Sequence, residues 1–100
     1  MIDPDAQRLA GIRLRAALQP DTRVYLVERS PSRSKYTRYV DLQVVAPDRT
    51  IASIAPDVAA YFDLRYAPDH KGLHFTRTSP EQLVGSLSVA FRVALVPAWL

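Results

Sequence analysis

Residues 39–46 read Tyr-Val-Asp-Leu-Gln-Val-Val-Ala (YVDLQVVA), and apolar and polar residues alternate along them. The even positions are Val40, Leu42, Val44 and Ala46, and the odd ones are Tyr39, Asp41, Gln43 and Val45. Residues two apart in a strand point to the same face of a sheet. The stretch therefore predicts a half-buried antiparallel strand with its even-numbered side chains in the core.

Outward from this strand, capping and turn residues mark the other elements. Asp3-Pro4 and Ser79-Pro80 each place a capping residue before a proline at the first helical position, and Gln82 would complete a capping box with Ser79. We expect, in order, a helix from Asp3 to about Gln19, strands at 24–28, 39–46 and 50–54, a short helix opening at Pro56, a strand at 73–76, and a helix from Pro80 that Pro97 stops near Val96.

The apolar faces of the elements predict how they pack. The first helix presents the arc Ala6, Leu9, Ala10, Ile12, Ala16 and Ala17. The last helix and the alternating strand are expected to share a core of Val40, Leu42, Val44, Leu83, Leu87, Ala90 and Phe91. The predicted fold class is α+β, one domain over residues 1–100, in the order α-β-β-β-α-β-α with a small, mostly antiparallel sheet packed on helices.

The overall composition is that of a globular protein. Of the 100 residues 48% are apolar or aromatic and 23% are charged, there is no cysteine, and no apolar run approaches the ~20 residues of a membrane-spanning helix. The N-terminus lacks the basic start and apolar run of a signal peptide. We expect a soluble protein without membrane contact, located in the cytoplasm.

Positive charge is concentrated between the first two predicted strands. Residues 24–40 carry Arg29, Arg33, Lys35 and Arg38 against Glu28, four charges minus one, which equals the net charge of +3 for the whole chain. Arginine and serine are donors suited to phosphate oxygens. We expect a basic hairpin tip whose phosphate-binding residues are Arg29, Ser32, Arg33, Ser34, Lys35, Tyr36 and Arg38, with Tyr36 or Tyr39 stacking on a base.

The same segment resembles a family of small accessory proteins of phages and prophages. That family carries Tyr, three residues, Arg-His-Val-Ser-Arg-Ser-Gly-Met, one residue and Arg, followed by an alternating strand. The matching positions here are Tyr25, Arg29, Ser32, Arg33, Ser34 and Arg38. Later matches at Val58-Ala59, Gly72-Leu73, Leu83-Val84 and Leu87-Ser88 extend the resemblance over roughly residues 23–92, so that the first helix (1–19) lies outside it.

The chain also departs from that family. Ser30-Pro31 replaces His-Val, Lys35-Tyr36 replaces Gly-Met, and Arg77–Pro80 replaces a glycine-rich segment. The loss of glycine weakens the expectation of a tight backbone at the tip. The resemblance implies a mobile-element accessory protein acting in a host cell, without implying a particular activity.

Catalytic patterns are sparse. His70 and His74 are separated by Gly72 and no third metal ligand is suggested, so the sequence favours neither a metal site nor a cofactor. Ser32 and Ser34 have no evident general base nearby. The sequence favours a binding protein over an enzyme; as an enzyme, its least implausible form would handle phosphate with Arg33 and Ser34.

Three readings of the tip follow from these residues. The first is weak, non-specific binding of DNA or RNA through the phosphate backbone. The second is docking on an acidic surface of a host protein, as in a host-takeover or anti-defence inhibitor. The third is structural: the tip is a solvated hairpin end in which Arg29 and Arg38 pair with Glu28 and Asp41 across the strands.

The apolar C-terminus, residues 93–100, adds a further expectation. Trp99 and Leu100 could form the interface of a homodimer, and the alternative is that Trp99 packs within its own subunit.

Overall fold

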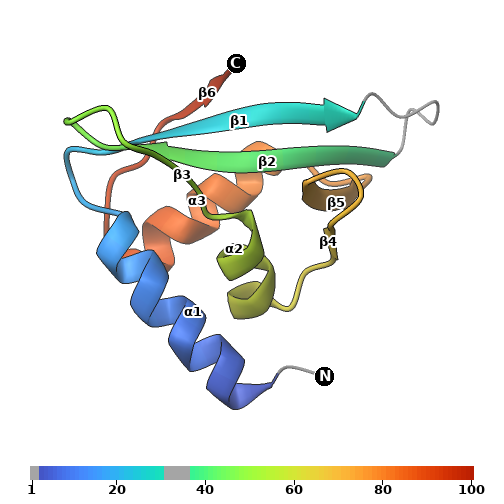
Figure 1. Cartoon of the computed structure of the whole chain (residues 1–100), viewed down its shortest axis with the longest axis horizontal. Coiled ribbons are helices and arrows are strands. Elements are labelled where there is room, and N and C mark those ends of the chain that lie inside the picture. Colours follow the sequence, from blue (N-terminus) through green and yellow to red (C-terminus); the bar gives the residue numbers. More distant parts are fainter. Residues whose placement is uncertain (1–2, 31–36) are drawn as a thin grey trace.

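The computed structural model describes residues 3–30 and 37–100 and shows one α+β domain, which confirms the predicted class (Figure 1). Its elements are α1 (Pro4–Ala17), β1 (Arg23–Ser30), β2 (Thr37–Val45), β3 (Ile51–Ser53), α2 (Ala55–Phe62), β4 (Tyr66–Ala67), β5 (Gly72–Thr76), α3 (Pro80–Phe91) and β6 (Pro97–Trp99). The predicted order is present, with the short strands β4 and β6 added to it.

The predicted alternating strand is the centre of the sheet. The strands lie in the order β4-β5-β2-β1-β6, and β3 also pairs with β2. β2 pairs with β1 along one edge, while β5 and β3 share its other edge, all antiparallel. Only β6 runs parallel to its neighbour, β1, among the pairs that the described strands form.

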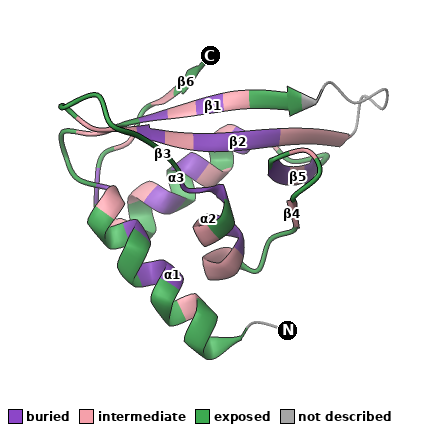
Figure 2. Ribbon diagram, viewed as in Figure 1, coloured by how far each residue is buried: buried purple, intermediate pink, exposed green. Residues whose placement is uncertain are grey.

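The two faces of the sheet differ in what covers them. All three helices lie on one side of β1 and β2, the inner face (Figure 1). Val40, Leu42 and Val44 point to this side and are buried, as predicted, together with Val24 and Leu26 of β1. Figure 2 shows buried residues gathered where the helices meet the sheet. The opposite side, the outer face, carries the odd-numbered residues of β1 and β2 and has no helix over it in the described parts of the chain.

The prediction for α3 is correct at its start and wrong at its end. Val84 and Leu87 are fully buried and Leu83 and Phe91 are half-buried, but Ala90 is exposed because it lies at the edge of this stripe. The helix ends at Phe91, five residues before Val96.

The end of α3 is set by a residue that carries no obvious stop signal. Arg92 takes a left-handed conformation, φ 53°, and its N–H donates to the Ser88 carbonyl. This turn buries Val93 and returns residues 97–99 to the edge of β1 as β6. Pro97, which we expected only to stop a helix, instead begins an edge strand, a position where a missing N–H is tolerated.

The buried stripe of α1 is also rotated from the predicted arc. Asp3 caps the helix as expected, accepting from the Asp5 N–H at 3.0 Å. The buried residues are, however, Ala10, Gly11, Leu14 and Leu18, whereas Leu9 and Ile12 are 44% and 48% exposed. The reason is a close approach to α2: a Cβ on Gly11 would lie 3.1 Å from the Tyr61 ring, so the smallest side chains face that ring.

Candidate nucleic-acid interface

Arg29 lies at an irregularity in the hairpin. Glu28 pairs with Val40 and Ser30 with Tyr39, so Arg29 is an extra residue in β1, a β-bulge. Bulges redirect a side chain locally. Here the Arg29 Nη2 donates to the Asp41 Oδ2 at 2.9 Å.

Asp41 is the centre of a polar cluster on the outer face. Although its position alternates away from the core, as predicted, Asp41 is only 2% exposed. Besides Arg29, the Ser53 hydroxyl donates to its Oδ1 at 2.7 Å and the Gln43 amide to its Oδ2 at 3.2 Å. A buried carboxylate is tolerated when it is paired and hydrogen-bonded in this way. Asp41 is thus covered by the donors that bind it, although it lies on the face away from the core.

Arg38 forms a second cluster, which joins the hairpin to the C-terminus. Its guanidinium contacts Glu28 at 3.1 Å and lies 4.9 Å from the centre of the Trp99 ring. The Trp99 indole N–H in turn donates to the Glu81 Oε1 at 2.7 Å. The cluster therefore connects β1, β2, β6 and the first turn of α3.

Glu81 is held in its charged form within this cluster. A hydrogen bond from the Ser79 hydroxyl is the largest cause that lowers its pKa, followed by its own backbone N–H and the Trp99 indole. Because the Ser79 hydroxyl donates to Glu81, it does not bond to the backbone at the start of α3. The predicted capping box is therefore wrong. The α3 start still depends on Pro80 at its first position.

Aromatic rings gather on the outer face at the hairpin end. The Tyr39 ring stacks on His70, with 3.8 Å between ring centroids and an angle of 14°, and His74 lies tilted at 5.4 Å. We call Tyr39, His70 and His74 the ring cluster. All three residues are half-exposed, so part of their ring surface is open to a ligand.

Gly72 allows this cluster to form. A Cβ there would lie 3.0 Å from the Val40 backbone, an unusually tight contact, so glycine favours the close approach of β5 to β2. The register then places His74 opposite Tyr39. This cluster was not predicted from the sequence, because His70 and His74 were considered only as metal ligands. The cluster could have been predicted from the pairing of the two strands that contain Tyr39 and His74.

The predicted binding residues fall into three groups. Arg29 and Arg38 lie at the base of the hairpin in ion pairs, as the structural reading expected. Ser32, Arg33, Ser34, Lys35 and Tyr36 lie outside the described residues, so their binding roles stay predictions. Trp99 contacts Glu81 and Arg38 within its own chain and is still 43% exposed, while Leu100 is 73% exposed.

Within residues 3–30 and 37–100, no three side chains of the metal-ligating types are grouped to hold an ion. None of the helices formed by these residues is long and apolar enough to cross a bilayer.

Fold and site together define a small α+β domain whose sheet has helices on one face and a ring cluster on the other. No family model, no curated protein and no solved structure matches the chain. The resemblance to phage accessory proteins stays a prediction.

Proposed function

We propose that this protein binds nucleic acid at the hairpin end of its sheet, as a small phage-type accessory protein acting in the host cytoplasm. The observation that carries the proposal is the ring cluster, which lies half-exposed on the helix-free face beside the strand ends that the basic segment joins. Bases stack on such rings whatever their sequence, and cations hold the phosphates between them. The proposed binding is weak and has little sequence preference.

The ion pairs change how much of the binding is electrostatic. Arg29 is neutralised by Asp41 and Arg38 by Glu28, so the proposal assigns the phosphate contacts of the hairpin to its two other cations, Arg33 and Lys35. Two phosphate contacts on a duplex give a slope of log K against log salt of about −1.8, at ~0.9 per contact. A fourfold rise in salt then weakens binding by roughly one decade.

Fluorescence anisotropy with a labelled duplex at several salt concentrations tests this proposal. We expect Arg33→Ala to lower the affinity at low salt on every sequence and to flatten the slope by about one unit. Arg15→Ala is the matched control, because it removes the same charge from the exposed side of α1 and is expected to leave the slope unchanged.

The opposite result has a defined meaning. A folded wild-type protein that binds neither single-stranded nor duplex oligonucleotides at low salt would exclude nucleic-acid binding. The basic segment would then belong to the alternative function, docking on an acidic surface of a host protein, which co-purification with the host protein would detect.

A further inference from the structure

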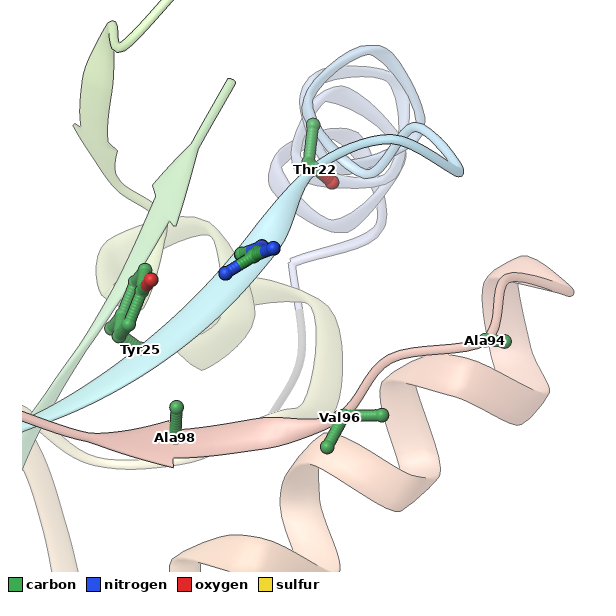
Figure 3. Close-up of a pocket in the computed structure, with 6 residues that line it drawn as sticks. Thr22, Tyr25, Ala94, Val96 and Ala98 are labelled. Carbon is green, nitrogen blue, oxygen red and sulfur yellow. The ribbon is translucent and has the colours of Figure 1, made fainter. Parts of the chain in front are cut away.

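A pocket borders the outer face at the start of β1, away from the hairpin end. Its cavity has a volume of about 330 Å³. Figure 3 shows Tyr25 of β1 on one side and Ala94, Val96 and Ala98 of the C-terminal segment on the other. Thr22 and Arg23 complete the lining. We call this the Tyr25 pocket.

The lining combines a flat ring, aliphatic groups and one cation. Tyr25 supplies a half-exposed ring, and the aliphatic groups come from the opposite wall. Among the described residues no carboxylate lies within ion-pair distance of Arg23, so its charge is available to a ligand. A planar aromatic group attached to an anion fits this chemistry, and a nucleotide is such a molecule.

The Tyr25 pocket and the ring cluster lie along one path. Tyr25 pairs with Gln43 and therefore stands four residues along β2 from Tyr39, about 13 Å at ~3.3 Å per residue. Both tyrosines alternate onto the outer face. Gln43 lies beside Tyr25, and the neutral Arg29–Asp41 pair lies between the two tyrosines, so neither presents an unpaired negative charge to a phosphate backbone.

We infer that the Tyr25 pocket accepts one base of a single-stranded nucleic acid whose chain continues across the outer face to the ring cluster. Tyr25 stacks on the base and Arg23 contacts an adjacent phosphate. This inference rests on the proposed function and adds to it a preference for single strands, because bases stacked inside a duplex cannot enter the pocket.

Anisotropy with a fluorescein-labelled 12-nucleotide thymidine strand and a labelled 12-base-pair duplex tests the inference at one low salt concentration. Tyr25→Ala is expected to weaken single-strand binding by about 5- to 150-fold, the range measured when a stacking ring is removed. Duplex binding is expected to stay at the wild-type level. Arg33→Ala, in contrast, weakens both.

Controls separate the loss of a site from the loss of the fold. Tyr25→Phe keeps the ring and is expected to bind like the wild type. Ala94→Trp fills the cavity without removing a side chain and is expected to weaken single-strand binding in the same way, whereas Val89→Trp, on the exposed side of α3, is not. Thermal melts monitored by circular dichroism show whether each variant is folded. If Tyr25→Ala does not fold, the inference is tested with Ala94→Trp alone.

The outcomes distinguish the two proposals. Wild-type single-strand affinity in folded Tyr25→Ala, or in Ala94→Trp, would overturn the Tyr25 pocket while leaving the hairpin proposal intact. An equal loss on duplex and single strand would also overturn it. If the wild type bound neither probe, the proposed function itself would fail.

Discussion

At the scale of single residues, the two arginines at the base of the hairpin differ in what they stabilise. Arg29 neutralises a carboxylate that is 2% exposed, whereas the Glu28 that Arg38 contacts is 33% exposed in its side chain. A charge left unpaired in a buried place costs more than one left in water.

We therefore expect unequal losses of stability. Arg29→Ala should lower the free energy of unfolding by about 2–3 kcal/mol, less than a fully buried pair would lose because Arg29 itself is partly exposed. Arg38→Ala should cost about 1 kcal/mol, including its contact with the Trp99 ring. Urea denaturation of both variants measures this difference, and a larger loss for Arg38→Ala would contradict the assignment of Asp41 as the buried partner.

These pairs were one of the three interpretations of the tip drawn from the sequence, but their burial was not predicted. Arg29, Arg38, Glu28 and Asp41 lie on two neighbouring strands, so alternation and charge were enough to pair them across the hairpin. That Asp41 is covered depends on Ser53, which comes from β3, and on a bulge at Arg29. No local sequence pattern indicates the bulge, and none indicates that a serine twelve residues further along the chain contacts Asp41.

At the scale of elements, a single hydrogen bond connects the start of α3 to β6. The Trp99 indole donates to Glu81, whose pKa is lowered chiefly by the Ser79 hydroxyl and further by Trp99 and Arg38. A carboxyl whose pKa is lower in the folded state stabilises that state above its unfolded pKa, and this contribution is lost as the pH falls through the folded pKa. For Glu81 this loss begins below the ordinary glutamate pKa of 4.5 and is complete only below the lowered pKa of the folded state.

Trp99 is the only tryptophan, and its indole donates to Glu81, so its fluorescence should report the protonation of that carboxylate directly. We expect its fluorescence emission to shift as the pH is lowered below the ordinary glutamate pKa of 4.5, and the shift to be absent in Glu81→Gln. Asp48 also has a lowered pKa, caused mainly by Thr50, but it is remote in sequence from Trp99, and Asp48→Asn serves as the control. An identical titration in Glu81→Gln would disprove the connection.

Elements with a strong local pattern could be predicted, and those fixed by distant contacts could not. The alternation of residues 39–46 gave the central strand and its buried face, and Asp3-Pro4 and Ser79-Pro80 gave two helix starts. β6 was missed because three residues carry no period and because Pro97 signals a helix stop as readily as an edge strand. The rotation of α1 followed from Gly11 meeting Tyr61, a contact between helices that the pattern of one helix does not contain.

At the scale of the whole molecule, the homodimer prediction depends on exposed apolar side chains at the open edge of the sheet, beside β6. Val96 is 80% and Leu100 73% exposed, on either side of a strand that pairs only with β1 among the described strands. Such an edge can pair with the same strand of a second copy. Trp99 is already engaged by Glu81 and Arg38, so we expect Val96 and Leu100, rather than Trp99 alone, to supply the contact.

Sedimentation velocity over a range of protein concentrations tests this assembly. We expect a concentration-dependent dimer that Val96→Lys disperses, whereas Ile12→Lys, which adds the same charge to exposed apolar surface on α1, does not. A monomer at several hundred micromolar would remove the homodimer.

Because Val96 also lines the Tyr25 pocket, a dimer through β6 and a bound single strand would occupy the same edge. Added thymidine oligonucleotide should then shift the sedimenting species toward the monomer, and an unchanged dimer that binds the oligonucleotide fully would show that the two surfaces are separate.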